Sequence, residues 1–108
     1  MKEEIQKAAS LLKEGNVVAI PTETVYGLAA NAFNEDAVRK IFEIKGRPLF
    51  NPLIIHIKSL AFLEQLVYNI PPKALQLAHH FWPGSLTLIL PKKEIVPNII
   101  TAGKNTVA

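Results

Sequence analysis

Two stretches in the first half of the chain carry apolar residues at helical spacing. In residues 2–14 these positions recur at i, i+3, i+4 and i+7, and Gly15 follows, a residue that often ends helices. The second stretch, residues 35–45, starts after Asn34, whose side chain can cap a helix, and stops before Gly46. The pattern therefore predicts two helices. The residues expected on their buried faces are Ile5, Ala8, Ala9 and Leu12 in the first and Ala37, Val38, Ile41, Phe42 and Ile44 in the second.

Two more helices are predicted in the second half. One follows Ser59, a favourable N-cap, and the other starts at Pro71 and Pro72, because proline is well tolerated in a first helical turn. Their expected buried residues are Phe62, Leu63, Leu66 and Val67, and then Ala74, Leu75, Ala78 and Phe81.

Short apolar runs predict strands between and after these helices. They cover residues 17–20, 53–57 and 86–90, and a fourth strand begins at 106–108. Residues 91–105 show no period and are expected to be irregular. The alternation of helices and strands favours an α/β fold with a mixed sheet.

The composition is apolar for so short a chain. Of 108 residues 49% are hydrophobic and the mean hydropathy is +0.20, although small domains need proportionally more polar surface. The chain also stops inside an apolar strand, which would leave an unfinished sheet edge. We therefore expect residues 1–108 to be the N-terminal part of a single domain whose sheet is incomplete in this chain.

Composition also excludes several functional classes. The chain has no cysteine, so disulfides, thiolate zinc sites and cysteine nucleophiles are excluded. Its apolar runs are far shorter than the roughly 20 residues of a membrane span, and no secretory apolar region follows the charged N-terminus. A cytoplasmic location without membrane contact is the expectation. The net charge of +3 suits an anionic ligand such as a nucleotide.

The first candidate site directly follows the first predicted strand. Residues 21–28 read Pro-Thr-Glu-Thr-Val-Tyr-Gly-Leu, and the region 21–33 has no clear period. Loops after strands of α/β proteins often bind ligands, and Thr22, Glu23 and Thr24 offer hydroxyls and a carboxylate to a small polar substrate. The alternative is a turn in which the two threonines bond to the local backbone.

A second candidate site follows the second predicted helix. Lys45-Gly46-Arg47-Pro48 places two cations around a glycine, and Asn51 follows closely. Arginine offers a planar fork to phosphate oxygens and lysine a mobile point charge, so the pattern fits a polyphosphate clamp, although no Walker A sequence is present. Alternatively, Lys45 only complements the helix C-terminus and Arg47 is solvated.

Histidines and an aromatic run are weaker candidates. His56 interrupts an apolar run and could serve a ligand or the structure. His79 and His80 are adjacent on a predicted helix, so their side chains diverge by about 100° and cannot easily share a metal. Residues 81–84, Phe-Trp-Pro-Gly, could stack an adenine ring or fill the core. Residues 92–94 are expected to be only a charged loop.

Five motifs together resemble the YrdC-like threonylcarbamoyl-AMP synthase family. They occur in order and with matching spacing, and Ser85 stands where the family usually has proline. The matching stretches are residues 21–28, 41–48, 51–57, 81–90 and 101–108.

This resemblance implies a twisted α/β sheet with flanking helices that encloses a large basic cavity. It implies a nucleotidyltransferase that forms threonylcarbamoyl-AMP and pyrophosphate from ATP, L-threonine and bicarbonate, for threonylcarbamoyladenosine modification of tRNA. Mg²⁺ is expected with the triphosphate. The expected partners are RNA or tRNA and the downstream proteins that transfer the threonylcarbamoyl group to tRNA.

The resemblance also implies roles for individual residues. By position, Thr24 and His56 would bind L-threonine. The residues that would bind ATP are Lys45, Arg47, Asn51 and Thr106. No catalytic residue and no protein-bound metal is assigned, because positioning and charge neutralisation suffice for this chemistry. The family's later elements, an arginine in the last strand and an S-x-N sequence, are not in this chain, so we expect these 108 residues not to turn over alone.

Three other functions fit parts of the pattern. The first is a module that binds double-stranded RNA or tRNA without catalysis. The sequence argues mildly against it, because the chain has only two arginines and its longest basic run has two residues. The second is the carbamoyl-transfer domain of larger hydrogenase-maturation proteins, which normally brings zinc-finger and acylphosphatase segments. The third is an inactive structural remnant.

Overall fold

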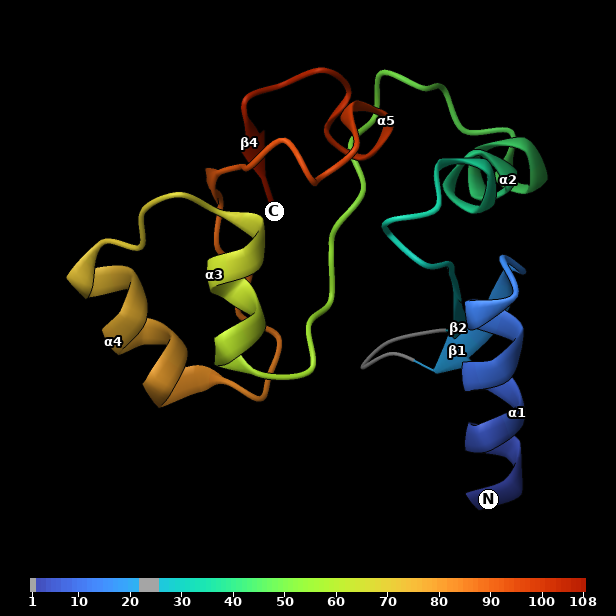
Figure 1. The fold of residues 1–108 in the computed structure, drawn as a ribbon, viewed down its shortest axis with the longest axis horizontal. Helices are drawn as coiled ribbons and strands as arrows, with labels where there is room; N and C mark the ends of the chain where they lie inside the picture. The colour runs from blue at the N-terminus through green and yellow to red at the C-terminus, as the bar shows by residue number, and fades with distance from the viewer. Residues whose placement is uncertain (1, 22–25) are drawn as a thin grey trace. The chain divides into compact units, whose positions relative to one another are not determined.

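A computed structural model of the chain describes residues 2–21 and 26–108, which form two compact units that meet between Asn51 and Pro52 in the sequence. The two units are described separately (Figure 1). The helices are α1 (Lys2–Lys13), α2 (Glu35–Lys45), α3 (Leu63–Leu66), α4 (Pro72–Phe81) and α5 (Asn98–Thr101), with a 3₁₀ helix η1 (Leu60–Phe62), and the strands are β1 (Val18–Pro21), β2 (Tyr26–Ala29), β3 (Leu90–Pro91) and β4 (Thr106–Val107). The α/β class is therefore confirmed. That residues 1–108 belong to a single domain stays a prediction.

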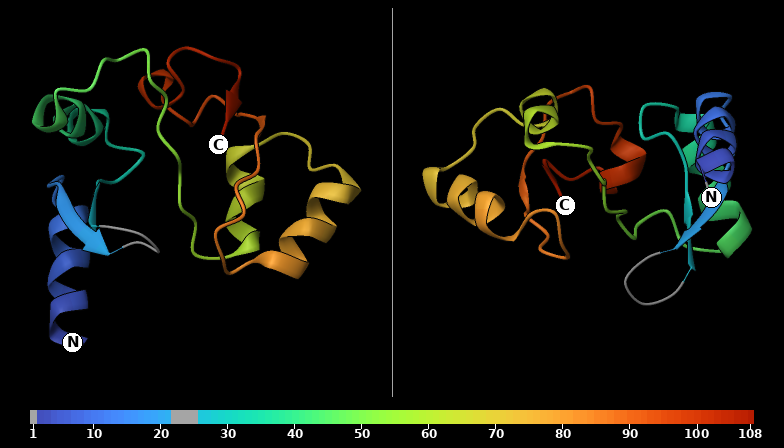
Figure 2. Two further views of the ribbon diagram at one scale, coloured as in Figure 1. Left: turned by 180° about the vertical axis from the view of Figure 1, so that it is seen from behind. Right: turned by 90° about the horizontal axis from the view of Figure 1, so that it is seen from below.

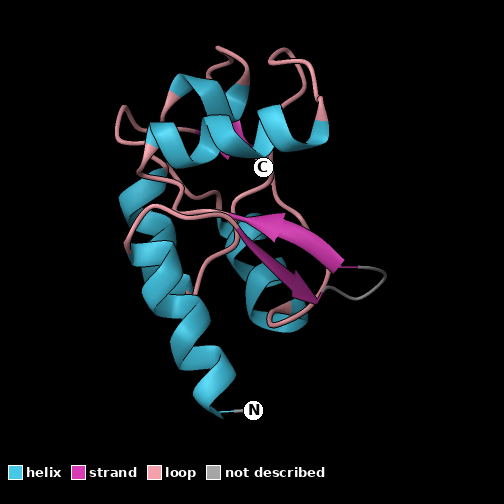
Figure 3. Cartoon of the chain, turned by 90° about the vertical axis from the view of Figure 1, so that its right-hand side faces the viewer, coloured by secondary structure: helices cyan, strands magenta, loops and turns pink. Residues whose placement is uncertain are grey.

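The first unit contains a two-stranded antiparallel sheet with α1 alongside it (Figure 2). β1 pairs with β2 from Val18 opposite Ala29 to Pro21 opposite Tyr26. Figure 3 shows the two strands in magenta. The sequence predicted β1 but expected no strand between residues 21 and 33. β2 was missed because it is only four residues long and Gly27 interrupts its apolar pattern.

Helix α1 forms as predicted, but its apolar face is not buried. None of its described residues is buried, and Ile5 is 65% exposed. Spacing along a helix specifies which side chains share a face, but burial needs a second element to cover that face. The prediction was therefore right about the helix and wrong about its burial.

Helix α2 begins and ends where the sequence predicted. The side chain of Asn34 accepts a hydrogen bond from the backbone nitrogen of Ala37 at 3.1 Å, and Gly46 ends the helix in the left-handed region with φ 62°. The predicted stripe is buried at Ala37, Val38, Ile41 and Phe42. Ile44 was wrongly included, and it is 64% exposed. At 100° per residue it lies about 90° around the helix from the centre of that stripe.

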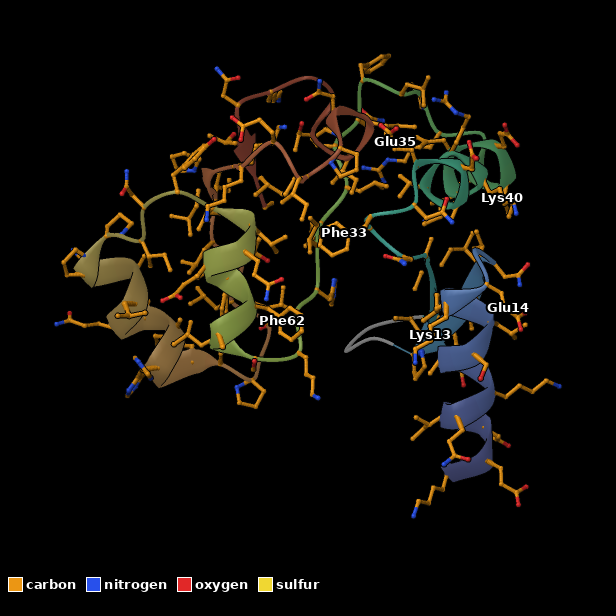
Figure 4. The ribbon with its side chains drawn as sticks, viewed as in Figure 1. Lys13, Glu14, Phe33, Glu35, Lys40 and Phe62 are labelled. Carbon is orange, nitrogen blue, oxygen red and sulfur yellow. The ribbon has the colours of Figure 1, made fainter. Side chains whose placement is uncertain are left out.

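The end of α1 is tied to α2 by a long side chain. The Lys40 Nζ donates to the backbone oxygen of Gly15 at 3.3 Å. Figure 4 labels Lys40 on α2 and shows Lys13 and Glu14 at the end of α1, just before Gly15. The glycine that ends α1 is therefore held against the surface of α2.

The second unit contains less sheet than predicted. β3 and β4 are antiparallel, with Leu90 opposite Val107 and Pro91 opposite Thr106. Of the predicted strand 86–90, only Leu90 is in a strand. The predicted strand 53–57 is wrong: this segment is extended but is not part of a sheet among the described residues.

The extended segment 53–57 is nevertheless fixed by backbone hydrogen bonds. The Leu53 nitrogen donates to Ile100 oxygen at 2.8 Å, and the Ile55 nitrogen donates to Ala108 oxygen at 3.0 Å. Exposure alternates along it, as expected for period 2, with Ile54 57% exposed between two half-buried residues. The apolar pattern thus predicted the extended backbone but not its pairing.

The helices of the second unit supply much of its core, with two corrections to the expected faces. Phe62 is 39% exposed, and on α4 both Leu75 and Phe81 are exposed, whereas smaller Ala74 and Ala78 are buried. Ser59 occupies the N-cap position of η1, but its side chain makes no capping hydrogen bond there. The short helix α5 was missed in a region expected to be irregular. The buried apolar residues are Leu63, Leu66, Val67, Ala74, Ala78, Leu90, Val96, Ile100 and Val107.

Within residues 2–21 and 26–108, no helix is long and apolar enough to cross a membrane.

Candidate functional site

The C-terminal end of α2 fixes the backbone of the predicted cation pair. The Gly46 nitrogen donates to Glu43 oxygen at 3.3 Å, and the Arg47 nitrogen donates to Phe42 oxygen at 3.0 Å. These two bonds and the left-handed glycine form a Schellman motif. Lys45 is exposed in the last turn, and Arg47 follows the cap with a half-buried side chain. The cations therefore come from a rigid helix end.

A turn after this cap adds the third residue of the predicted nucleotide site. The Asn51 nitrogen donates to Pro48 oxygen at 3.1 Å, which closes residues 48–51 into a turn. Asn51 is half-buried. The first unit thus presents Lys45, Arg47 and Asn51 from one continuous cap and turn.

An open hollow of about 270 Å³ lies at the same end of α2. Four of its lining residues follow helical spacing at i, i+3, i+4 and i+7. The lining residues are Arg39, Phe42, Glu43, Gly46, Arg47 and Leu49. Sequence reasoning identified Arg47 here but missed Arg39 and Glu43. Arg39 and Glu43 could have been found from their spacing to Gly46, because residues three, four and seven positions apart lie on the same face of a helix.

The second unit carries the other two described residues of the predicted site. His56 is exposed on the extended segment, and Thr106 is exposed on β4, where it lies opposite Pro91. The hydrogen bond from Ile55 to Ala108 places the segment of His56 beside the strand of Thr106. These two segments are therefore neighbours within the second unit.

Three residues of the first candidate site, Thr22, Glu23 and Thr24, lie outside the described part of the chain. Thr24, expected to bind L-threonine, and Glu23, considered as a base, belong to residues 22–25. The structure brings Lys45, Arg47 and Asn51 together in one unit and the segments of His56 and Thr106 together in the other.

The weaker candidates have local structural contacts. The rings of His80 and Phe81 meet edge to face, with centroids 4.7 Å apart, and His79 is exposed on α4. The Trp82 Nε1 donates to Leu86 oxygen at 2.8 Å, which closes the loop after α4. In the part of the chain that the structure describes, no group of three or more histidine or acidic side chains could hold a metal ion.

Residues 92–94 were expected to be only a charged loop, but two of them make specific contacts with Glu64 and Tyr68. Lys93 Nζ lies 5.9 Å from the centre of the Tyr68 ring and donates to Glu64 oxygen at 2.7 Å. The Tyr68 hydroxyl donates to the Glu94 carboxylate. This hydrogen bond lowers the pKa of Glu94 and raises the pKa of Tyr68. The loop is therefore tied to the segment around α3, although no predicted site residue takes part.

Comparison with known proteins identifies relatives over nearly the whole chain. A sequence model of the Sua5/YciO/YrdC family, described as "Telomere recombination", matches residues 10–108. The chain is 61% identical over 104 residues to threonylcarbamoyl-AMP synthase of Pyrococcus abyssi, which covers 96% of this chain and 31% of that protein. It is 58% identical over 106 residues to threonylcarbamoyl-AMP synthase of Bacillus subtilis, covering 97% of this chain and 31% of that protein.

The fold is similar to that of a larger solved structure. The crystal structure of P. abyssi Sua5 complexed with L-threonine matches with a TM-score of 0.95 and 58% identity, over 99% of this chain and 32% of that chain. The chain thus spans about a third of the length of these relatives. From the match to residues 10–108 and from these similarities in sequence and fold, we conclude that the chain belongs to the Sua5/YciO/YrdC family.

Proposed function

We propose that this chain supplies part of the substrate site of a threonylcarbamoyl-AMP synthase. The observation that carries the proposal is the 61% identity to the P. abyssi synthase. The likeness to a Sua5 structure complexed with L-threonine supports threonine as one substrate. Because the chain spans 31% of that synthase, the complete reaction is proposed for a protein of the relatives' length.

The proposed reaction has two steps. The amino group of L-threonine attacks the carbon of bicarbonate and yields an N-carboxylate and water. A carboxylate oxygen then attacks the α-phosphorus of ATP, the bond to the bridging oxygen breaks, and pyrophosphate leaves. The product is threonylcarbamoyl-AMP, which proteins acting downstream would use to modify tRNA. Binding of RNA by this chain itself stays a prediction.

Lys45, Arg47, Asn51 and Thr106 are the proposed ATP-binding residues. The first three come from the cap of α2 and the turn that follows it, and Thr106 comes from β4. Charge builds up on phosphate oxygens as pyrophosphate leaves, and cations on a preorganised backbone stabilise that charge without reorganising. Mg²⁺ would arrive as part of the ATP complex and neutralise further phosphate charge.

Thr24 and His56 are the proposed threonine-binding residues. A hydroxyl and an imidazole can both bond to the polar groups of an amino acid. His56 is exposed on a segment whose backbone is held just before it by hydrogen bonds from Leu53 and Ile55. Because the His56 side chain is exposed and its backbone is fixed, it can contact a ligand. When no ligand is bound, the imidazole is not a buried polar group without a partner.

A chimeric enzyme tests the proposed function directly. This chain would replace the matching 31% of the P. abyssi synthase, and pyrophosphate release would be measured with ATP and Mg²⁺. We expect release that requires both L-threonine and bicarbonate. His56→Ala should raise mainly the KM for L-threonine, and Lys45→Ala mainly the KM for ATP. Release that ignores L-threonine, or a chimera that folds but releases none, would contradict the proposal.

The 108-residue chain on its own is the matched control. We expect it to release no pyrophosphate, because it spans only 31% of the length of the P. abyssi synthase. Co-substrate-dependent release by the chain alone would refute that expectation while supporting the reaction itself.

A further inference from the structure

We propose that Tyr68 and Glu94 act together as positioning residues for Thr106. Their hydrogen bond holds one edge of a layer of paired backbone segments in the second unit, and β4, which carries Thr106, lies further along the same layer. This inference rests on the proposed function, since it concerns how one proposed ATP-binding residue is held in place.

The segment that follows β3 lies in the middle of this layer. The Lys92 nitrogen donates to Asn105 oxygen at 2.9 Å on one side, and the Lys93 nitrogen donates to Leu66 oxygen at 2.6 Å on the other. Val67 and Lys92 also form an antiparallel bridge. The segment is therefore paired on both edges, with β4 on one side and the residues that end α3 on the other.

The position of Thr106 depends on this middle segment. Hydrogen-bonded and non-hydrogen-bonded pairs alternate along an antiparallel ladder. Because Lys92 bonds to Asn105, the next pair, Pro91 opposite Thr106, is a non-hydrogen-bonded pair. The backbone of Thr106 is therefore held through its neighbours, and Asn105, directly before it, is bonded to Lys92.

The far edge of the layer has a buried base. Leu66 and Val67 are 5% and 1% exposed, so their backbone is fixed by the core of the second unit. The Lys93 Nζ adds a bond of 2.7 Å to the backbone oxygen of Glu64. A segment that is bonded to these residues takes its position from the core.

Tyr68 and Glu94 hold the turn that continues from the middle segment. The Tyr68 hydroxyl donates to the Glu94 carboxylate, and the Lys93 Nζ lies 5.9 Å from the centre of the Tyr68 ring. Tyr68 is 56% exposed and Glu94 is exposed, so apolar burial contributes little at this place. A hydrogen bond to a charged acceptor is stronger than one between neutral groups, so this bond is suited to holding the turn.

Native-state hydrogen exchange of the 108-residue chain, followed by NMR, tests the structural step. We expect Tyr68→Phe to speed exchange of the Lys92 amide about two- to tenfold, which is the equivalent of losing one hydrogen bond. The Trp82 amide, which donates to Ala78 oxygen at the end of α4, is the internal reference and should not change. A Lys92 amide that exchanges at the unaltered rate would overturn the inference.

The chimeric enzyme tests the link to ATP. Tyr68→Phe should raise the KM for ATP about threefold and leave kcat and the KM for L-threonine unchanged, because only binding of ATP is weakened. Thr106→Val removes the hydroxyl and keeps the branched shape. If Tyr68 acts through Thr106, the double variant is no worse than Thr106→Val alone. Additive effects would show that Tyr68 acts by another route, and the inference would be wrong.

Variants of Glu94 separate the hydrogen bond from the charge. Glu94→Gln retains an oxygen that can accept from Tyr68, so it should behave as the unaltered chain does, whereas Glu94→Ala should match Tyr68→Phe. Gln76→Ala is the control, because it removes another exposed polar side chain of the second unit, on α4, and it should change none of these quantities. A glutamine variant as impaired as the alanine variant would contradict the role of the bond.

The inference and the proposed function can fail separately. If Thr106→Val leaves the KM for ATP unchanged, the proposed role of Thr106 fails and this inference fails with it. If Thr106→Val raises that KM but Tyr68→Phe does not, the proposed function stands and only this inference fails.

Discussion

The side chain of Asn34 lies directly against Gly15. A β-carbon added to Gly15 would stand 2.9 Å from the Asn34 Nδ2, and Gly15 has φ 89°. The same Asn34 side chain caps α2 through its bond from Ala37. The glycine that ends one helix therefore leaves room for the residue that starts the other.

Replacing Gly15 by alanine should destabilise the chain. The substitution places an L-residue at positive φ and pushes against the capping side chain, so we expect a loss of about 1–3 kcal/mol in the free energy of unfolding. Urea unfolding followed by circular dichroism measures it. Gly103→Ala is the control, because Gly103 has φ 78° but open space where the β-carbon would be. Equal losses at both positions would show that contact with Asn34 adds nothing.

The cap itself can be tested at Asn34. Asn34→Ala removes the oxygen that accepts from the Ala37 nitrogen, and we expect a loss of about 1 kcal/mol. Asn34→Asp retains an acceptor and adds a charge favourable to the helix N-terminus, so it should lose much less stability. Unfolding by urea again gives the comparison. An aspartate variant as unstable as the alanine variant would contradict the capping role.

The hydrogen bond between Tyr68 and Glu94 predicts a pH dependence. The pKa of Glu94 is lowered from its ordinary value of 4.5, so the bond's contribution to stability is present above that pH and is lost as pH falls through the lowered pKa. The pKa of Tyr68 is raised from 10.0, so its contribution is present below that pH and is lost as pH rises through the raised pKa.

Tyr68→Phe should remove both effects. In an NMR titration of the side-chain carboxyl carbons, we expect the pKa of Glu94 to rise toward 4.5 in this variant. An unchanged pKa of Glu94 would mean that the backbone hydrogen bond at Glu94, together with Lys92 and Lys93, lowers it instead.

The loop after α4 should depend on the Trp82 indole. Trp82→Phe removes the donor to Leu86 oxygen while keeping an aromatic ring, and we expect a loss of about 0.5–1.5 kcal/mol in the free energy of unfolding. Because Trp82 is the chain's one tryptophan, unfolding must be followed by circular dichroism. A stability equal to that of the unaltered chain would show that water replaces the lost donor without cost.

The sequence predicted those features that depend on local chemistry. Asn34 and Gly46 delimit α2 correctly because capping and positive φ are properties of individual residues. The pairing of strands depends on distant partners, and here prediction failed: residues 53–57 are extended without joining a sheet among the described residues, and β2 was missed. Apolar alternation indicates an extended backbone but does not name its partner.

The candidate site was predicted in the same uneven way. The cation pair at Lys45 and Arg47 was recognisable because it directly follows a helix-ending glycine. Arg39 and Glu43 lie on the exposed surface of α2 and were missed, since a hollow is formed by residues beyond the helix as well, such as Leu49. Sequence spacing predicts which face of α2 a side chain lies on. It does not predict which residues outside the helix form the rest of the hollow.

The presence of both arginines in one hollow gives this chain an unusual chemical handle. A dicarbonyl reagent such as phenylglyoxal reacts with guanidinium groups and leaves lysine ammonium groups largely alone. Every adduct that it forms with an arginine of this chain would therefore lie on Arg39 or Arg47. Mass spectrometry of the labelled chain could then follow access to this single surface without any substitution in the protein.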